Sequence, residues 1–265
     1  HYPFENKQWF EEHFPADFIV EYINQTRGWF YTLTILSACL FDRPAFKNAT
    51  VNGIIVAQDG KKMSKRLKNY TPPDILLEKH GADALRLYLI HSNLVRAEEM
   101  RFCDDGVIDM RRRILLPWFN AYKFFSTYSG IDGWQPGEQM PVYENVLDQW
   151  ITSRLHTLVS QVNSQMQAYA LHGIVHSICH FLDDLTNTYI RLNRCRFWAE
   201  GMEKDKQLAY QCLFEILLTF GKLMAPFTPF LSESIHQKMR SNLLKNNNTH
   251  PLSVHMYSYP ESSSK

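Results

Sequence analysis

Residues 17–57 decide the fold class of the first part of the chain, and they read DFIVEYINQTRGWFYTLTILSACLFDRPAFKNATVNGIIVA. The first seven, DFIVEYI (17–23), are rich in β-branched and aromatic residues, which predicts a short buried strand. The longer apolar run over residues 26–41 ends at Asp-Arg-Pro and predicts a helix. TVNGIIVA (50–57) predicts a second strand. Two strands joined by one helix form a parallel βαβ unit, which we expect to be half of a nucleotide-binding sheet.

The remainder of the chain is predicted to be helical. Residues 74–79 and 82–91 form an amphipathic helical pair, and the strand pattern ends at about residue 105. Further helices are expected over residues 106–128, 146–170, 172–199 and 207–224, and from Pro226 and Pro229 to about residue 239. The sequence therefore predicts an α/β part followed by an all-α helical bundle. Residues 246–265 are polar and Ser-rich, so we expect a loose end there.

Composition limits the class of protein. The 265 residues are 45% hydrophobic with a net charge of +1, which excludes a disordered chain. The longest uncharged apolar stretch, residues 28–41, is too short to cross a membrane. Five cysteines, at positions 39, 103, 179, 195 and 212, include no CxxC pair. We therefore expect neither a disulfide framework nor a structural metal, and we predict a reduced, cytoplasmic protein.

The densest charged segment is KKMSKRLK (61–68), in which five of eight residues are cations. Charge alone also fits a solvated surface run or a localisation signal. The segment follows the end of a predicted strand through an Asp-Gly turn, however, and open α/β sheets bind ligands at those strand ends. Lysines on such a loop can neutralise charge on a polyphosphate during phosphoryl or nucleotidyl transfer.

Several motifs resemble one enzyme family. Lys62-Met63-Ser64-Lys65-Arg66 is similar to the KMSKS signature of class I aminoacyl-tRNA synthetases, and NQTRGWFY (24–31), preceded by Glu21, is similar to the DQ(H/T)RGWF segment of isoleucyl-tRNA synthetases. FPADFI (14–19), GADALR (81–86) and MAPFTPFL (224–231) match in the expected order. The wording of the first two motifs resembles the eukaryotic cytosolic branch.

The resemblance implies a domain plan. Residues 1–104 would form the C-terminal half of a Rossmann-type catalytic domain, with the KMSKR loop and a stem-contact region. Residues 105–245 would form a helical anticodon-binding domain, and residues 246–265 a polar tail. The implied enzyme is an isoleucine–tRNA ligase: ATP and isoleucine form isoleucyl-adenylate and pyrophosphate, and the acyl group then passes to the tRNA. Mg²⁺ would accompany the ATP.

The resemblance also implies site residues. The catalytic residues would be Lys62, Ser64 and Lys65. The two lysines would stabilise the negative charge of the ATP phosphates, and Ser64 would shape the loop. Adenylate binding would involve these two lysines together with Glu21, Asn24, Gln25 and Trp29. Alternative roles stay open, because Glu21 and Gln25 can cap the following helix and an aromatic on an apolar helix is often a core residue.

Two positions depart from the family pattern Glu-Gly-x-Asp-Gln. Tyr22 places a ring where a glycine would let a ligand approach the backbone, and Asn24 lacks the charge of an aspartate. We expect both changes to weaken contact with the adenylate.

The helical half carries a basic and aromatic cluster for tRNA. Arg191, Arg194, Arg196 and Trp198 lie near the end of one predicted helix, where arginines can pair with phosphates and rings can stack on unpaired bases. A solvated helix end is the alternative. His172, His176 and His180 recur every four residues, but three histidines along one helix cannot converge on a tetrahedral ion, so we expect a polar face and no metal site.

The family's HIGH signature and its editing domain fall outside this sequence. We therefore expect the chain by itself not to activate isoleucine. The alternative is a non-catalytic, synthetase-derived RNA-binding or assembly protein. Partners in a multi-synthetase complex are not predicted from the sequence.

Overall fold

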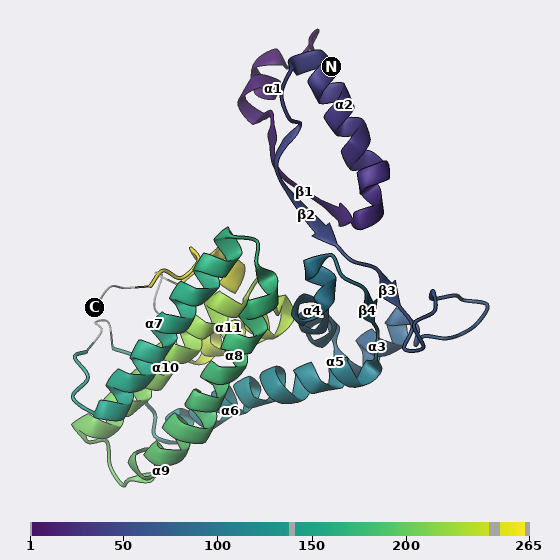
Figure 1. Ribbon diagram of the computed structural model, residues 1–265. Coiled ribbons are helices and arrows are strands. Elements are labelled where there is room, and N and C mark those ends of the chain that lie inside the picture. Colours follow the sequence, from purple (N-terminus) through teal and green to yellow (C-terminus); the bar gives the residue numbers. More distant parts are fainter. Residues whose placement is uncertain (1, 138–140, 244–249, 263–265) are drawn as a thin grey trace. The chain divides into compact units, whose positions relative to one another are not determined.

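The computed structural model describes residues 2–137, 141–243 and 250–262 (Figure 1). The chain divides into two compact units, which are described separately. The first unit comprises His1–Tyr70 and Ser92–Phe102, and the second comprises Thr71–His91 and Cys103–Lys265. Residues 71–91 thus pack with the helical part of the chain, whereas the domain boundary predicted from sequence lies after residue 104.

The first unit contains the predicted βαβ element. Its elements are α1 (Lys7–His13), β1 (Ala16–Tyr22), a 3₁₀ turn (Ile23–Arg27), α2 (Trp29–Phe41) and β2 (Phe46–Asn52). β1 and β2 pair in parallel, with Ala16 opposite Phe46 and Tyr22 opposite Asn52. The parallel crossover is confirmed, and α2 starts three residues later than predicted because the 3₁₀ turn precedes it.

The predicted strand over residues 50–57 is two strands. β2 ends at Asn52, and β3 (Ile55–Val56) pairs in parallel with β4 (Met100–Arg101). The break falls at Gly53, whose N–H donates to the carbonyl of Leu94 at 2.8 Å. A Cβ at this glycine would overlap the backbone of Glu98, so only glycine lets the two segments approach.

The second unit is a helical bundle, as predicted. Its helices are α3 (Pro73–His80), α4 (Ala82–His91), α5 (Asp104–Met110), α6 (Leu116–Ile131), α7 (Val146–Gln167), α8 (Ile174–Asp183), α9 (Arg191–Trp198), α10 (Lys204–Met224) and α11 (Pro229–Leu243). Figure 1 shows α7, α8, α10 and α11 grouped in this unit; α7 contacts α8 and α10, and α10 and α11 contact α6. Large aromatic side chains fill the centre, and Trp118, Phe125, Phe181, Tyr189 and Phe220 are fully buried.

Two predicted helices contain a wide turn. Residues Arg111–Leu115 form a π-helical turn between α5 and α6, and Asp184–Ile190 form another between α8 and α9. Each helix continues in the same direction because the residues on both sides of the turn keep right-handed helical angles. Periodicity alone predicts the long helices but not these turns.

The motifs GADALR and MAPFTPFL contact each other. The Asp83 carboxylate accepts the N–H groups of Phe230 at 3.4 Å and Leu231 at 2.7 Å at the start of α11. The Arg86 guanidinium donates to the carbonyls of Pro226 at 2.8 Å and Phe227 at 3.2 Å, just after α10. Asp83 is therefore an N-terminal cap supplied by another helix, and Arg86 neutralises a helix C-terminus.

The predicted loose end is wrong for residues 250–262. Val254 is buried, and the Glu233 carboxylate of α11 accepts both the Ser253 hydroxyl and the Val254 N–H at 2.9 Å. The Tyr259 hydroxyl donates to the carbonyl of Leu223 at 3.0 Å. Scattered apolar and aromatic residues anchor this segment despite its polar composition. Residues 246–249 and 263–265 lie outside the described residues.

Candidate nucleotide- and RNA-binding sites

A tight turn leads from β3 into the basic loop. The N–H of Gly60 donates to the carbonyl of Ala57 at 2.8 Å, and the N–H of Ala57 donates to the carbonyl of Lys61 at 2.9 Å. Gly60 has a φ of +78°, which a glycine adopts without strain. Asp59 accepts the N–H of Lys61 at 3.0 Å. The Asp-Gly turn predicted from sequence is therefore present at this strand end.

Asn69 fixes the shape of the basic loop. Its side-chain oxygen accepts the N–H of Ser64 at 3.0 Å, and its amide nitrogen donates to the carbonyl of Lys62 at 3.2 Å. The N–H of Lys68 donates to the carbonyl of Ser64 at 3.0 Å. These bonds fix the backbone of the motif, and none of them places a carboxylate beside its lysines. Sequence analysis missed Asn69, although asparagine commonly bonds nearby backbone groups in turns.

Four cations of this loop are available to an anion. Lys62, Lys65, Arg66 and Lys68 are exposed, and none of them forms an ion pair within the described residues. Lys61 differs, because its ammonium lies 3.8 Å from the Asp59 carboxylate. Unpaired lysines on a loop held by backbone hydrogen bonds can meet phosphate oxygens with charge-assisted hydrogen bonds.

The end of β1 holds the predicted adenylate residues. Gln25 accepts the N–H of Trp29 at 2.9 Å through its side-chain oxygen, so it caps α2, the alternative role left open for it. Asn24 donates to the Tyr22 hydroxyl at 3.0 Å, and the two family departures thus contact each other. Glu21 is exposed, and its carboxylate accepts the N–H of Tyr22 at 3.3 Å.

Trp29 is not a core residue. It is 46% exposed and lies at the edge of an apolar cavity of about 390 Å³, which Phe14, Leu36 and Leu40 also line. No hydrogen bond or ion pair among the described residues joins the end of β1 to the basic loop. The structure therefore presents two separate groups of candidate residues within the first unit.

Arg196 is held inside the bundle. Its guanidinium donates to both Asp148 oxygens, at 2.8 and 2.9 Å, and to both Asp205 oxygens, at 2.7 and 2.8 Å. The side chain of Arg196 is 9% exposed and that of Asp148 is 1% exposed. Burial disfavours the charge of Arg196, but the hydrogen bonds that it donates to these carboxylates raise its pKa. Arg196 therefore links α9 to α7 and α10, and this geometry argues against contact with tRNA.

The other three residues of the predicted tRNA cluster face outward. Arg191 and Arg194 are exposed, and Trp198 is 54% exposed. The Arg194 guanidinium lies 6.0 Å from the Trp198 ring, and this ring lies 6.2 Å from that of Tyr128 on α6. The exposed side of α9 thus presents two arginines and one accessible ring, which suits phosphates and unpaired bases.

Two family models match parts of the chain. Residues 1–101 match the model for class I tRNA synthetases (I, L, M and V), and residues 148–265 match the model for the anticodon-binding domain of tRNA ligases. Each match covers less than half of the chain, and together they span most of it. The first match contains the basic loop and the end of β1, and the second contains the basic cluster of α9.

Relatives with curated names are isoleucine–tRNA ligases. The chain is 49% identical over 259 residues to the ligase of Bdellovibrio bacteriovorus and 51% identical over 263 residues to that of Chlamydia pneumoniae. Each alignment covers 98% of this chain but 24% of the relative, so the chain spans about a quarter of the relatives' length. Nothing in these comparisons favours the alternative of a non-catalytic RNA-binding protein. Both relatives are bacterial, so assignment to the eukaryotic cytosolic branch is not supported.

Solved structures show the same fold. A leucyl-tRNA synthetase of Agrobacterium radiobacter K84, in a ternary complex with tRNA and LeuAMS, has a TM-score of 0.67 at 21% identity, with 94% of this chain and 29% of that chain covered. A methionyl-tRNA synthetase of Mycobacterium tuberculosis, in complex with methionyl-adenylate, has a TM-score of 0.70 at 18% identity, with 97% and 53% covered. These likenesses support the predicted Rossmann-type and helical-bundle fold classes.

The three predicted histidines do not share one helix, because His172 lies in a 3₁₀ turn (Leu171–Gly173) and His176 and His180 lie on α8. His172, His176 and His180 are exposed, and the rings of His176 and His180 lie 4.1 Å apart. Within the described residues, no group of three or more His, Cys, Asp or Glu side chains could hold a metal ion. In the same part of the chain, no helix is long and apolar enough to span a membrane.

Proposed function

We propose that this chain is the part of an isoleucine–tRNA ligase that holds the ATP phosphates and binds the tRNA. The observation that carries the proposal is the identity of about half of all residues to isoleucine–tRNA ligases over 98% of the chain. The exposed, unpaired cations of the basic loop support it independently, because amino-acid activation requires charge stabilisation at a polyphosphate.

In the proposed first step, a carboxylate oxygen of isoleucine attacks the α-phosphorus of ATP. The bond from this phosphorus to the bridging oxygen breaks, and pyrophosphate leaves with the negative charge. Lys62 and Lys65 would stabilise that charge, and Ser64 would keep the loop in shape through its N–H bond to Asn69. In the second step, a ribose hydroxyl of the tRNA attacks the acyl carbon and AMP leaves.

Adenylate contacts are proposed for Glu21, Asn24, Gln25 and Trp29. Glu21 is exposed and Trp29 is half-exposed beside an apolar cavity, so both are accessible to a ligand. Gln25 also caps α2, and Asn24 must share its amide with the Tyr22 hydroxyl. Mg²⁺ would accompany the ATP, because phosphate oxygens are ligands that this ion prefers.

The tRNA contacts proposed for the second unit are Arg191, Arg194 and Trp198. Arg196 is removed from this group because its donors are occupied by Asp148 and Asp205. The five cysteines are free thiols, which supports the proposal that the protein works in the reducing cytoplasm. Partners other than tRNA, isoleucine and ATP are not proposed.

The decisive experiment replaces Lys65 with alanine in the full-length ligase. We expect Lys65→Ala to slow ATP–pyrophosphate exchange with isoleucine by about 100-fold, since one electrostatic donor to a developing charge is typically worth this much. The Kd for tRNA should change less than twofold. Lys47→Ala is the matched control, because Lys47 is an exposed lysine paired with Asp17 at 2.8 Å. Normal exchange by Lys65→Ala would remove the loop from the reaction.

A further inference from the structure

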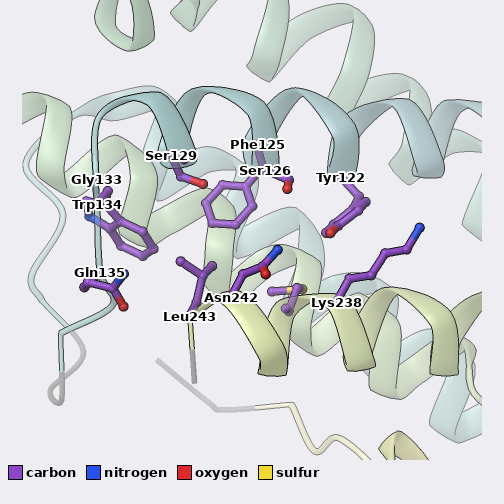
Figure 2. A pocket seen from close by; sticks show the side chains of 12 residues that line it. Tyr122, Phe125, Ser126, Ser129, Gly133, Trp134, Gln135, Lys238, Asn242 and Leu243 are labelled. Atoms are coloured by element: carbon purple, nitrogen blue, oxygen red, sulfur yellow. The ribbon is translucent and has the colours of Figure 1, made fainter. Parts of the chain in front are cut away.

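A cavity of about 230 Å³ lies between α6 and α11 of the second unit (Figure 2). Phe125 and Trp134 line it, and their ring centroids are 5.8 Å apart. Both rings also contact Tyr210 of α10, at 6.4 and 5.8 Å. The cavity is therefore a gap in the aromatic core of the bundle. The end of β1 in the first unit differs, because its polar side chains are exposed and bonded to each other.

The two departures from the family pattern form one hydrogen-bonded unit there. Tyr22 is the last residue of β1, and Asn24 lies in the 3₁₀ turn that follows. The Asn24 amide nitrogen donates to the Tyr22 hydroxyl at 3.0 Å. Because β1 pairs in parallel with β2, this turn lies at the carboxyl end of the sheet, where open α/β sheets bind ligands. The pair therefore stands at the edge where a nucleotide is expected.

Tyr22 lies on the exposed face of the two-stranded sheet. Side chains alternate between the faces of a strand, and Ile19 on one face is buried, whereas Phe18, Val20 and Tyr22 on the other are exposed. In the parallel register, Tyr22 stands opposite Asn52, the last residue of β2. The Tyr22 ring is 38% exposed. Its hydroxyl is therefore a surface group at the strand end and not part of a packed core.

The hydrogen bond within the pair decides what each side chain can offer to a ligand. The Asn24 amide nitrogen is used by Tyr22, so the amide oxygen is left as an acceptor. The Tyr22 oxygen accepts in this bond, so its O–H is left as a donor. Within the described part of the chain, neither side chain forms another hydrogen bond. A donor and an acceptor side by side complement a hydroxyl group, which itself both donates and accepts.

We propose that Tyr22 and Asn24 together bind one ribose hydroxyl of the adenylate. Tyr22 donates to the ribose oxygen, and the Asn24 side-chain oxygen accepts the ribose O–H. Tyr22 is thus a binding residue, whereas the sequence alone predicts that its ring weakens binding. The inference rests on the proposed function and adds to it a contact that the two departures create only in combination.

The test measures the Kd of the full-length ligase for a stable isoleucyl-adenylate analogue that carries a sulfamoyl group in place of the phosphate. Versions without the 2′ or the 3′ hydroxyl identify the ribose group that is bound. Tyr22→Phe keeps the ring and removes the donor. We expect it to weaken binding of the complete analogue about fivefold, as is typical of one neutral hydrogen bond. It should leave unchanged the Kd for the deoxy analogue that lacks the bound hydroxyl.

Reversion of both departures tests whether they act together. Asn24→Asp alone should weaken binding about fivefold, because a carboxylate only accepts and takes the Tyr22 O–H away from the ligand. Tyr22→Gly combined with Asn24→Asp removes this competition and should return the Kd to within about twofold of the wild-type value. Losses that simply add in the double variant would contradict the paired contact.

Tyr31→Phe is the matched control, because Tyr31 is an exposed tyrosine of α2 in the same unit that the proposed function does not use. It should bind every analogue like the wild type. A wild-type Kd in Tyr22→Phe, or an equal loss for the complete and both deoxy analogues, would overturn the ribose contact and leave the proposed function intact. No binding of the complete analogue by the wild type would overturn the proposed function itself.

Discussion

At the residue scale, Arg196 shows how position in the fold changes the role of a side chain. Its sequence neighbours Arg191 and Arg194 are exposed, whereas its own guanidinium neutralises the buried Asp148. The Tyr189 hydroxyl donates to the same carboxylate at 2.7 Å. A buried charge is tolerated only when it is paired and fully hydrogen-bonded, so this network constrains three helices at once.

We expect Arg196→Met to lower the free energy of unfolding by about 3–5 kcal/mol, because it leaves the Asp148 carboxylate buried without a counter-charge. Urea unfolding followed by circular dichroism measures this change. Arg194→Met is the control, since that side chain is exposed, and it should cost less than about 0.5 kcal/mol. Equal losses for the two variants would contradict the structural role assigned to Arg196.

At the scale of elements, the cap of α11 comes from another helix. Asp83 of α4 is buried, and its carboxylate takes the first free N–H groups of α11. Burial raises the pKa of Asp83, and the N–H groups of Leu231 and Phe230 oppose this shift. Asp83→Ala should lower the free energy of unfolding by about 1–3 kcal/mol, as expected when buried donors lose their acceptor.

Differential hydrogen exchange would locate this loss at the start of α11. Asp74→Ala is the matched control, because Asp74 is an exposed carboxylate in the first turn of α3. It should change stability by less than about 0.5 kcal/mol. Unchanged exchange at Phe230 and Leu231 in Asp83→Ala would show that the cap is dispensable.

The docked segment 250–262 is expected to respond to pH through His250. Burial lowers the pKa of His250, and the nearby Lys222 and His236 lower it further. The ring bonds the Tyr257 hydroxyl at 2.6 Å, and the Lys222 ammonium lies 3.9 Å from the centroid of the Tyr257 ring. Arg240 adds positive charge near the same tyrosine. Protonated His250 would therefore face the positive charge of Lys222 and the nearby His236.

The sign of the effect follows from the lowered pKa. The stabilising contribution is fully present above the unfolded pKa of about 6.5, and it is lost as the pH falls through the lower folded value. Hydrogen exchange in residues 250–262 should therefore be faster, after correction for the intrinsic rate, at pH 5.5 than at pH 7.5. His250→Gln should remove most of this difference. A pH dependence that persists unchanged in the variant would exclude His250 as its source.

At the scale of the whole molecule, the first unit has an incomplete sheet. β1 and β2 form a two-stranded parallel sheet, and Phe18, Tyr31, Leu36 and Leu40 are each more than half exposed. Parallel sheets are normally covered on both faces, and a surface this apolar is typical of one that other parts of a protein cover. The chain also spans about a quarter of the length of its ligase relatives.

We therefore expect the 265-residue chain by itself to catalyse no ATP–pyrophosphate exchange with isoleucine. The full-length ligase, assayed in parallel at equal concentration, is the positive control. Adding the isolated chain to the slowed Lys65→Ala ligase tests whether the chain can act in trans, and we expect no increase in the rate of exchange. Measurable exchange by the isolated chain would show that its own residues suffice for activation.

The sequence by itself determined the parallel βαβ unit, the helical bundle and the basic loop at a strand end. Each depends on local signals, namely periodicity, turn residues and clustered charge, which act over a few residues. The motif resemblance also identified the family without any contact between distant residues. The adenylate and loop residues stay predictions, since no ligand tests them.

Tertiary structure alone decided which polar groups are free. Sequence could not separate the buried Arg196 from the exposed Arg194, because only packing against Asp148 and Asp205 distinguishes them. It could not pair Asp83 with α11, dock residues 250–262, or split the second strand at Gly53. Each of these features depends on residues far apart in the chain, and burial then sets whether a charge must be paired within the protein.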